Sequence, residues 1–186
     1  MTTTMVVIVV AVIVVVAIVA FVLIRRERSR KLRAHFGPEY ERAFREYGNS
    51  AKAEEALAAR QKRMEKVHIH PLSEAERERF ANLWYRVQSK FVDDPRGSIR
   101  EADKLVMDVM VARGYPMTDF ERRADDLSVD YPHVVSNYRV AHEIALNEQT
   151  GEASTEDLRN AVVCYRKLFE ELLEGQPVQS QPVQRR

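Results

Sequence analysis

A run of 20 consecutive apolar residues, from Met5 to Ile24, constrains this chain more than any other feature. An α-helix of that length, at about 1.5 Å per residue, spans the roughly 30 Å hydrocarbon core of a bilayer. Fourteen of the 20 residues are Val or Ile, which favour strands in water, but a lone strand in lipid would leave its backbone groups without hydrogen bonds. The run therefore predicts one transmembrane helix over 5–24, preceded by a short tail over 1–4.

The flanks of the run predict its orientation. The four residues before it carry no charged side chain, and a signal-peptidase cut after Ala20 would place Ile18 where a small residue is needed. An uncleaved anchor is therefore favoured over a signal peptide. Six basic residues follow the run and form a basic collar at the expected membrane interface: Arg25, Arg26, Arg28, Arg30, Lys31 and Arg33. By the positive-inside rule the N-terminus lies outside and the C-terminal part lies in the cytoplasm.

The basic collar admits two interpretations at the membrane surface. Clustered cations near anionic headgroups gain about 1 kcal/mol each, so the collar could hold such lipids. A stop-transfer flank without lipid specificity explains the same residues, and we favour it.

The remainder of the chain is acidic. Residues 34–184 carry 21 basic and 27 acidic side chains, although the net charge of the whole chain is +1. An acidic body repels phosphate, so nucleic acid is not expected as a partner. A single cysteine excludes a disulfide framework, and one apolar run excludes a multi-span membrane protein.

Apolar residues after the collar recur at helical spacing, and no segment alternates long enough to indicate a strand. The predicted fold is all-α, with a basic juxtamembrane segment over 25–35, a helical stalk over 36–67, a compact bundle of about five helices over 68–175 and a disordered tail over 176–186. The stalk stripe comprises Phe36, Tyr40, Ala43, Phe44 and Tyr47, followed by Ala53, Ala56, Leu57, Arg60 and Met64.

Capping residues predict where the bundle helices begin and end. The expected starts are Ser73 with Glu76, Asp94 with Pro95, Thr118 with Glu121, and Ser154. The expected ends are Gly114, Gly151 and Gly175. The faces expected to be buried include Phe80, Trp84, Phe91, Val109, Leu127, Tyr138, Leu146 and Tyr165.

Candidate metal ligands are few and scattered. His68 and His70 share one side of an extended link before Pro71, but no Cys or His follows at a spacing that would complete a zinc site. Two surface histidines are the favoured interpretation. The acidic pairs Asp93-Asp94 and Asp125-Asp126 lack a calcium-loop pattern, so we expect solvated or capping carboxylates. We predict no metal and no cofactor.

Two further residues have reactive side chains. His142 falls within an apolar stripe and is expected to be buried and hydrogen-bonded, because the zinc-protease pattern would need a second His where Leu146 stands. Cys164 borders the stripe of the last helix and is expected to be a partly buried hydrophobe. Isolated glycines exclude a phosphate-binding loop.

Five short motifs, taken in order, resemble a group of uncharacterised bacterial single-pass membrane proteins. They are Phe36-Gly37-Pro38-Glu39-Tyr40, Phe91-Val92-Asp93-Asp94-Pro95, Gly114-Tyr115-Pro116, Ser128-Val129-Asp130-Tyr131-Pro132 and Ala153-Ser154-Thr155-Glu156-Asp157-Leu158-Arg159. The resemblance runs from about Leu32 to Leu173. It implies a bacterial inner-membrane setting and brings no activity, ligand or catalytic residue.

Three hypotheses on function follow. The first is a membrane-anchored protein whose cytoplasmic helical domain binds a protein partner without catalysis. The second is a membrane-tethered enzyme, or a domain binding a small ligand or metal in a helical pocket with His142, Trp84 or tyrosines. The third and weakest is a periplasmic domain.

Overall fold

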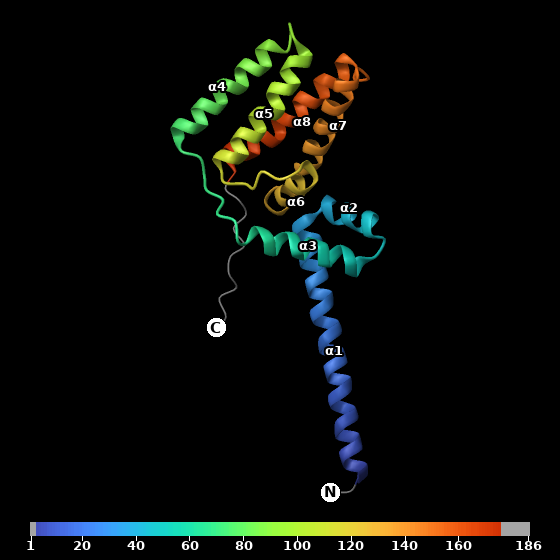
Figure 1. The fold of residues 1–186 in the computed structure, drawn as a ribbon. Coiled ribbons are helices and arrows are strands. Elements are labelled where there is room, and N and C mark those ends of the chain that lie inside the picture. The colour runs from blue at the N-terminus through green and yellow to red at the C-terminus, as the bar shows by residue number, and fades with distance from the viewer. Residues whose placement is uncertain (1–2, 176–186) are drawn as a thin grey trace. The chain divides into compact units, whose positions relative to one another are not determined.

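The computed structural model describes residues 3–175, which form eight α-helices and, within that range, no strand (Figure 1). The all-helical class and the N-terminal apolar helix are confirmed. The disordered tail predicted over 176–186 lies outside the described residues. The chain divides into two compact units, Met1–Leu57 and Ala58–Arg186, and the boundary between them lies inside one helix.

The first helix, α1 (Thr3–Phe36), is 34 residues long and includes the apolar run, the basic collar and one further turn without a break. It is long and apolar enough to cross a membrane. Leu32 and Phe36 are buried near its end, whereas the large apolar side chains described between Met5 and Ile24 are 40–69% exposed. The N-terminal part of α1 therefore exposes its apolar side chains, whereas its last turns pack within the first unit.

The turn after α1 depends on Gly37, whose φ of 46° favours a residue without a Cβ atom. Pro38 then occupies the first turn of α2 (Pro38–Tyr47), where its missing N–H costs nothing. The stalk stripe is confirmed at Tyr40 and Ala43, which are buried. Phe44 and Tyr47 depart from it, because they lie on the side of α2 that stays exposed.

α3 (Ser50–Met64) begins after Gly48, and its first turns belong to the first unit. Asn49 caps it by accepting a hydrogen bond from the Ala51 N–H at 2.8 Å. The Glu54 carboxylate accepts hydrogen bonds from Ser29 Oγ at 2.7 Å and from Tyr40 Oη at 2.9 Å. These two bonds join α1, α2 and α3.

The bundle comprises α4 (Glu74–Lys90), α5 (Pro95–Ala112), α6 (Phe120–Asp130), α7 (Val135–Thr150) and α8 (Thr155–Glu174). Complete capping boxes at Ser73 with Glu76 and at Ser154 with Asp157 confirm the predicted starts of α4 and α8. Asp94 caps α5 by accepting from the Gly97 N–H at 2.8 Å.

The predicted start of α6 is wrong by one residue. Thr118 with Glu121 was the expected capping box, but Asp119 is the N-cap and accepts from the Arg122 N–H at 3.0 Å. Both residues have a side-chain oxygen that suits the position, and the ionised carboxylate of Asp119 also interacts favourably with the helix dipole. α6 therefore starts at Phe120.

The bundle core lies where α5 and α8 pack together, with α4 and α7 on either side (Figure 1). Ile99, Val106 and Val109 of α5 are fully buried. Trp84 of α4 stacks on Phe169 of α8 with ring centroids 4.7 Å apart. Leu146 contradicts its predicted burial, because it lies on a flank of α7 and is 48% exposed.

A fully buried arginine connects the ends of two bundle helices. Arg113 follows α5, and its Nη1 donates to the Leu172 carbonyl in the last turn of α8 at 2.9 Å and to the Tyr131 hydroxyl. A cation at a helix C-terminus interacts favourably with the helix dipole and satisfies a carbonyl that has no partner within the helix. Arg113 thereby ties the end of α8 to α5.

We expect Arg113→Ala to lower the free energy of unfolding by about 2–4 kcal/mol, because it leaves a cavity and a buried carbonyl without a donor. Tyr131→Phe removes only one hydroxyl and should cost about 1 kcal/mol. Urea unfolding of the full chain in detergent, followed by circular dichroism, measures both. Arg122→Ala, at an exposed position, is the control and should change stability by less than about 0.5 kcal/mol.

Candidate functional site

The basic collar occupies consecutive turns of α1, so its six cations point around the helix in several directions. Arg30 forms an ion pair with Glu27 at 3.0 Å. The Arg33 guanidinium lies 4.7 Å from the centroid of the Tyr40 ring, in cation–π contact. Arg25, Arg26, Arg28 and Lys31 are exposed. The collar therefore presents cations to the surroundings of α1 while Arg33 belongs to the packing of the first unit.

The two histidines of the link lie outside any helix, and both side chains are exposed. The His70 N–H donates to the Arg113 carbonyl at 3.1 Å, so the link is held against the end of α5 through its backbone. Across residues 3–175, no group of three or more His, Cys, Asp or Glu side chains is placed to hold a metal ion.

The expectation that Asp125 and Asp126 are solvated or capping carboxylates is wrong. The side chain of Asp126 is 2% exposed and accepts two hydrogen bonds from Arg63, at 2.8 Å from Nε and 2.5 Å from Nη2. Asp125 pairs with Arg60 at 2.9 Å and with Arg139 at 3.0 Å. Buried carboxylates require such partners, since an unpaired buried charge is strongly unfavourable. The pair therefore joins the end of α3 to α6.

His142 differs from its predicted environment. Its side chain is half-buried, and its ring stacks on Phe120 with centroids 3.5 Å apart. Nδ1 is buried and has no hydrogen-bond partner among the described residues. Burial lowers the pKa of His142, aided by Arg123, while Asp103 and Glu121 act in the opposite direction. The histidine is therefore held by stacking rather than by the expected hydrogen bond.

The lowered pKa of His142 predicts a loss of stability in mild acid. As the pH falls below about 6.5, the unfolded chain takes up this proton before the folded chain does, so the free energy of unfolding decreases. Replacing His142 by Phe removes this contribution and keeps the stacking on Phe120. Urea unfolding at pH 7.5 and 5.5 should therefore show a smaller decrease for His142→Phe than for the wild type. An equal decrease in both would contradict the assignment.

Cys164 is buried in α8, and its Sγ lies 3.7 Å from Asn160 Oδ1 and 3.9 Å from Asn137 Oδ1. Burial raises the pKa of its thiol, although Lys167 acts in the opposite direction. The thiol is therefore the protonated, unreactive form at neutral pH, as a packed side chain requires.

Buried tyrosines form polar pairs that the sequence did not reveal. Tyr115 donates to Asp130 at 2.6 Å, and Tyr165 donates to Asp103 at 3.0 Å. Desolvation raises the pKa of both phenols, and the adjacent carboxylates raise them further. Both hydroxyls therefore remain protonated and act as structural donors.

The outer face of α4 carries strongly exposed aromatic and apolar side chains. Tyr85 is 71% exposed, and Val92, one residue beyond the C-cap Phe91, is 83% exposed. Val92 lies in the turn directly after α4, and its spacing of seven from Tyr85 continues the same side. Glu78, seven residues before Tyr85, is exposed and acidic. From residue 81 onward the exposed residues on that side are uncharged, and they are Ala81, Tyr85, Gln88, Ser89 and Val92. We call this surface the α4 face. Sequence periodicity could have found it, because uncharged residues recur on a side of α4 separate from the one that carries the buried Phe80 and Trp84.

Comparison with known proteins finds no matching family model, no matching curated protein and no matching solved structure. The resemblance to bacterial single-pass membrane proteins therefore stays a prediction.

Proposed function

We propose that this chain is a single-pass protein of the bacterial inner membrane, whose cytoplasmic helical body binds another protein. The observation that carries the anchoring is the 40–69% exposure of the large apolar side chains described between Met5 and Ile24. Each such side chain gains about 1.5–3 kcal/mol when it moves from water into an apolar environment. A bilayer supplies that environment along the length of α1.

Charge supports the orientation. The residues before the apolar run have no charged side chains, and the basic collar follows it directly. Cations are retained on the cytoplasmic side during insertion. The proposal therefore puts the N-terminus outside and residues 25–186 in the cytoplasm.

The α4 face supports the binding of a protein. Tyrosine is enriched where proteins meet, because its ring gives a large contact area and its hydroxyl a hydrogen bond. Tyr85 has that exposure, with Val92 as an apolar neighbour along the same side. Several polar groups in the bundle interior are instead bonded to one another, as in the bond from Arg123 Nε to Tyr138 Oη at 2.9 Å. Exposed contact residues on α4, together with bonded polar groups inside the bundle, favour a function at the surface over a reaction centre in the bundle.

The orientation predicts the behaviour of C-terminal fusions. Alkaline phosphatase needs the periplasm to become active, so its fusion after residue 175 should be inactive, while a green fluorescent protein fusion there should be fluorescent. The unfused chain should stay in the membrane pellet after extraction at pH 11. An active phosphatase fusion would support the periplasmic alternative, and release at pH 11 would contradict the anchor.

The α4 face predicts where a partner touches. With p-benzoylphenylalanine replacing Tyr85 in the full chain, ultraviolet light on intact cells should yield a discrete crosslinked species containing a second protein. The same replacement at Val92 should give the same species. Electrophoresis followed by mass spectrometry identifies it.

Arg86 provides the matched control, because it is exposed and adjacent in sequence but points about 100° away around α4. Crosslinking at Arg86 should be at least about fivefold weaker than at Tyr85. Equal yields at both positions, or none at Tyr85 and Val92, would exclude the α4 face as the binding surface.

A further inference from the structure

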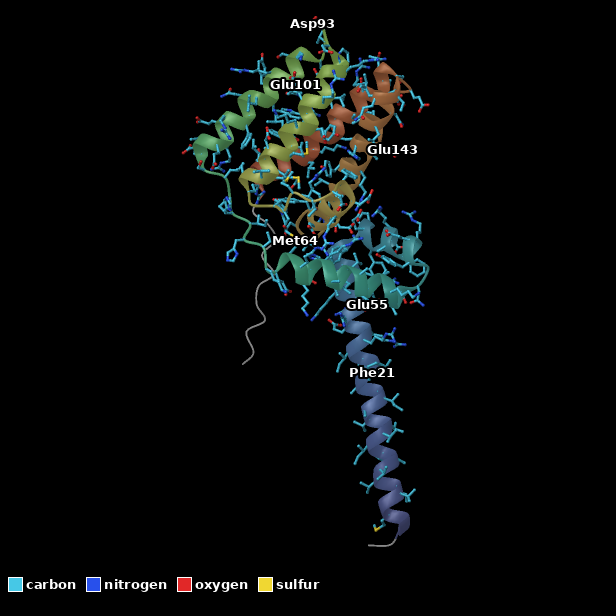
Figure 2. The ribbon with its side chains drawn as sticks, viewed as in Figure 1. Phe21, Glu55, Met64, Asp93, Glu101 and Glu143 are labelled. Carbon is cyan, nitrogen blue, oxygen red and sulfur yellow. The ribbon has the colours of Figure 1, made fainter. Side chains whose placement is uncertain are left out.

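A groove lies between α1 and α3 within the first unit, with a volume of about 520 Å³. Its walls are formed by Phe21, Ile24, Arg25 and Arg28 of α1 and by Ala51, Glu54 and Glu55 of α3. Figure 2 marks one residue on each wall, Phe21 on α1 and Glu55 on α3. The volume is within the range of pockets that hold small ligands.

The α1 wall is divided between apolar and basic residues. Phe21, Ile24, Arg25 and Arg28 follow the spacing i, i+3, i+4 and i+7, so they form one stripe. The stripe rises about 10 Å along the helix axis. Its two apolar residues end the apolar run, and its two arginines begin the basic collar. The groove therefore lies at the level where the hydrocarbon region would meet the headgroups.

The α3 wall is acidic and firmly held. Glu54 accepts one hydrogen bond from Ser29 of α1 and one from Tyr40 of α2, and these bonds hold α3 against both helices. Glu55, next to it, is exposed, and its carboxylate forms no ion pair or hydrogen bond with another described residue. The same is true of the guanidinium groups of Arg25 and Arg28. Two cations and two carboxylates thus line the groove, and three of these four charges have no partner in the described chain.

The balance of charge selects the chemistry of an occupant. A lining with equal numbers of both signs suits a zwitterion, whereas an anionic headgroup would meet two carboxylates. Arginine pairs well with a phosphate, and a carboxylate accepts hydrogen bonds from a primary ammonium. A quaternary ammonium has no N–H donor and is usually held by several aromatic rings, of which this groove has only Phe21.

We propose that this groove binds one phospholipid whose headgroup carries a phosphate and a primary ammonium, as in phosphatidylethanolamine. Arg25 and Arg28 hold the phosphate, Glu55 accepts from the ammonium, and the start of an acyl chain lies along Phe21 and Ile24. The inference rests on the membrane anchoring proposed above and is independent of the α4 face. Under this inference, two arginines of the basic collar belong to a specific lipid site, in contrast to the stop-transfer flank without lipid specificity that the sequence favours.

Native mass spectrometry of the full chain in mild detergent tests the site. The protein is titrated with phosphatidylethanolamine, phosphatidylglycerol or phosphatidylcholine of identical acyl chains. We expect one phosphatidylethanolamine to bind at least about tenfold more tightly than either of the other two lipids. Equal binding of all three lipids overturns the proposal, and tighter binding of phosphatidylglycerol shows an anionic-lipid collar instead.

Two variants and one control separate the groove from the rest of the collar. Glu55→Gln should remove the preference for phosphatidylethanolamine over phosphatidylcholine. Arg28→Gln should weaken the binding of phosphatidylethanolamine and of phosphatidylcholine at least about fivefold. Arg26→Gln makes the same change of charge on another side of α1 and should bind like the wild type. Glu55 is exposed, so its variant should retain the wild-type circular dichroism spectrum, which is measured for each protein.

The outcomes also separate this inference from the anchoring. A Glu55→Gln variant that keeps the preference, or an Arg26→Gln variant that loses it, overturns the groove. If the lipid preference is absent and the chain resists extraction at pH 11, only the groove fails. If the chain is released at pH 11, the anchoring fails and the groove has no bilayer beside it.

Discussion

The apolar surface of α1 is the constraint to which the rest of this protein conforms. Its backbone groups are bonded within the helix, so the segment can enter an environment that offers no hydrogen bonds. Its side chains find no cover in the described chain, and the polar sequence begins only after Ile24. Beyond Ile24 the chain reverses at Gly37 and turns again at Gly48, and the first turns of α3 then lie beside α1. The membrane proposal and the lipid groove both depend on this arrangement.

Local signals predicted much of the fold. Capping residues act over three or four positions, so Ser73, Asp94 and Ser154 could be identified from the sequence and are confirmed. Buried stripes also repeat locally, which is why the faces of α5 and α8 were correct. The predicted cap at Thr118 was wrong because Asp119, which directly follows, suits an N-cap equally well. Helical periodicity cannot distinguish two helix starts that differ by one residue.

Long-range polar partners could not be predicted in this way. Arg113 and Leu172 are 59 positions apart, and Arg63 and Asp126 are 63 apart, so no local pattern links them. The sequence around Asp126 predicts a solvated carboxylate, because its partner Arg63 lies at the end of α3, far away in the sequence. Of the candidate sites, one could be predicted from the sequence and the other could not. The basic collar is evident in the sequence, but the groove needs Glu54 and Glu55, which reach α1 only after the chain reverses.

The unbroken course of α1 also determines how far each cation stands from a membrane surface. Residues of a helix along the bilayer normal rise about 1.5 Å each, so Arg33 stands about 12 Å beyond Arg25. Ionic screening at physiological salt reduces electrostatic attraction over about 8 Å. With the anchoring proposed above, Arg25, Arg26 and Arg28 would act within the headgroup field, whereas Arg33 would stand farther from it and contacts Tyr40. In that setting, a collar that looks uniform in sequence would be graded with height, with lipid attraction near Arg25 and protein packing at Arg33.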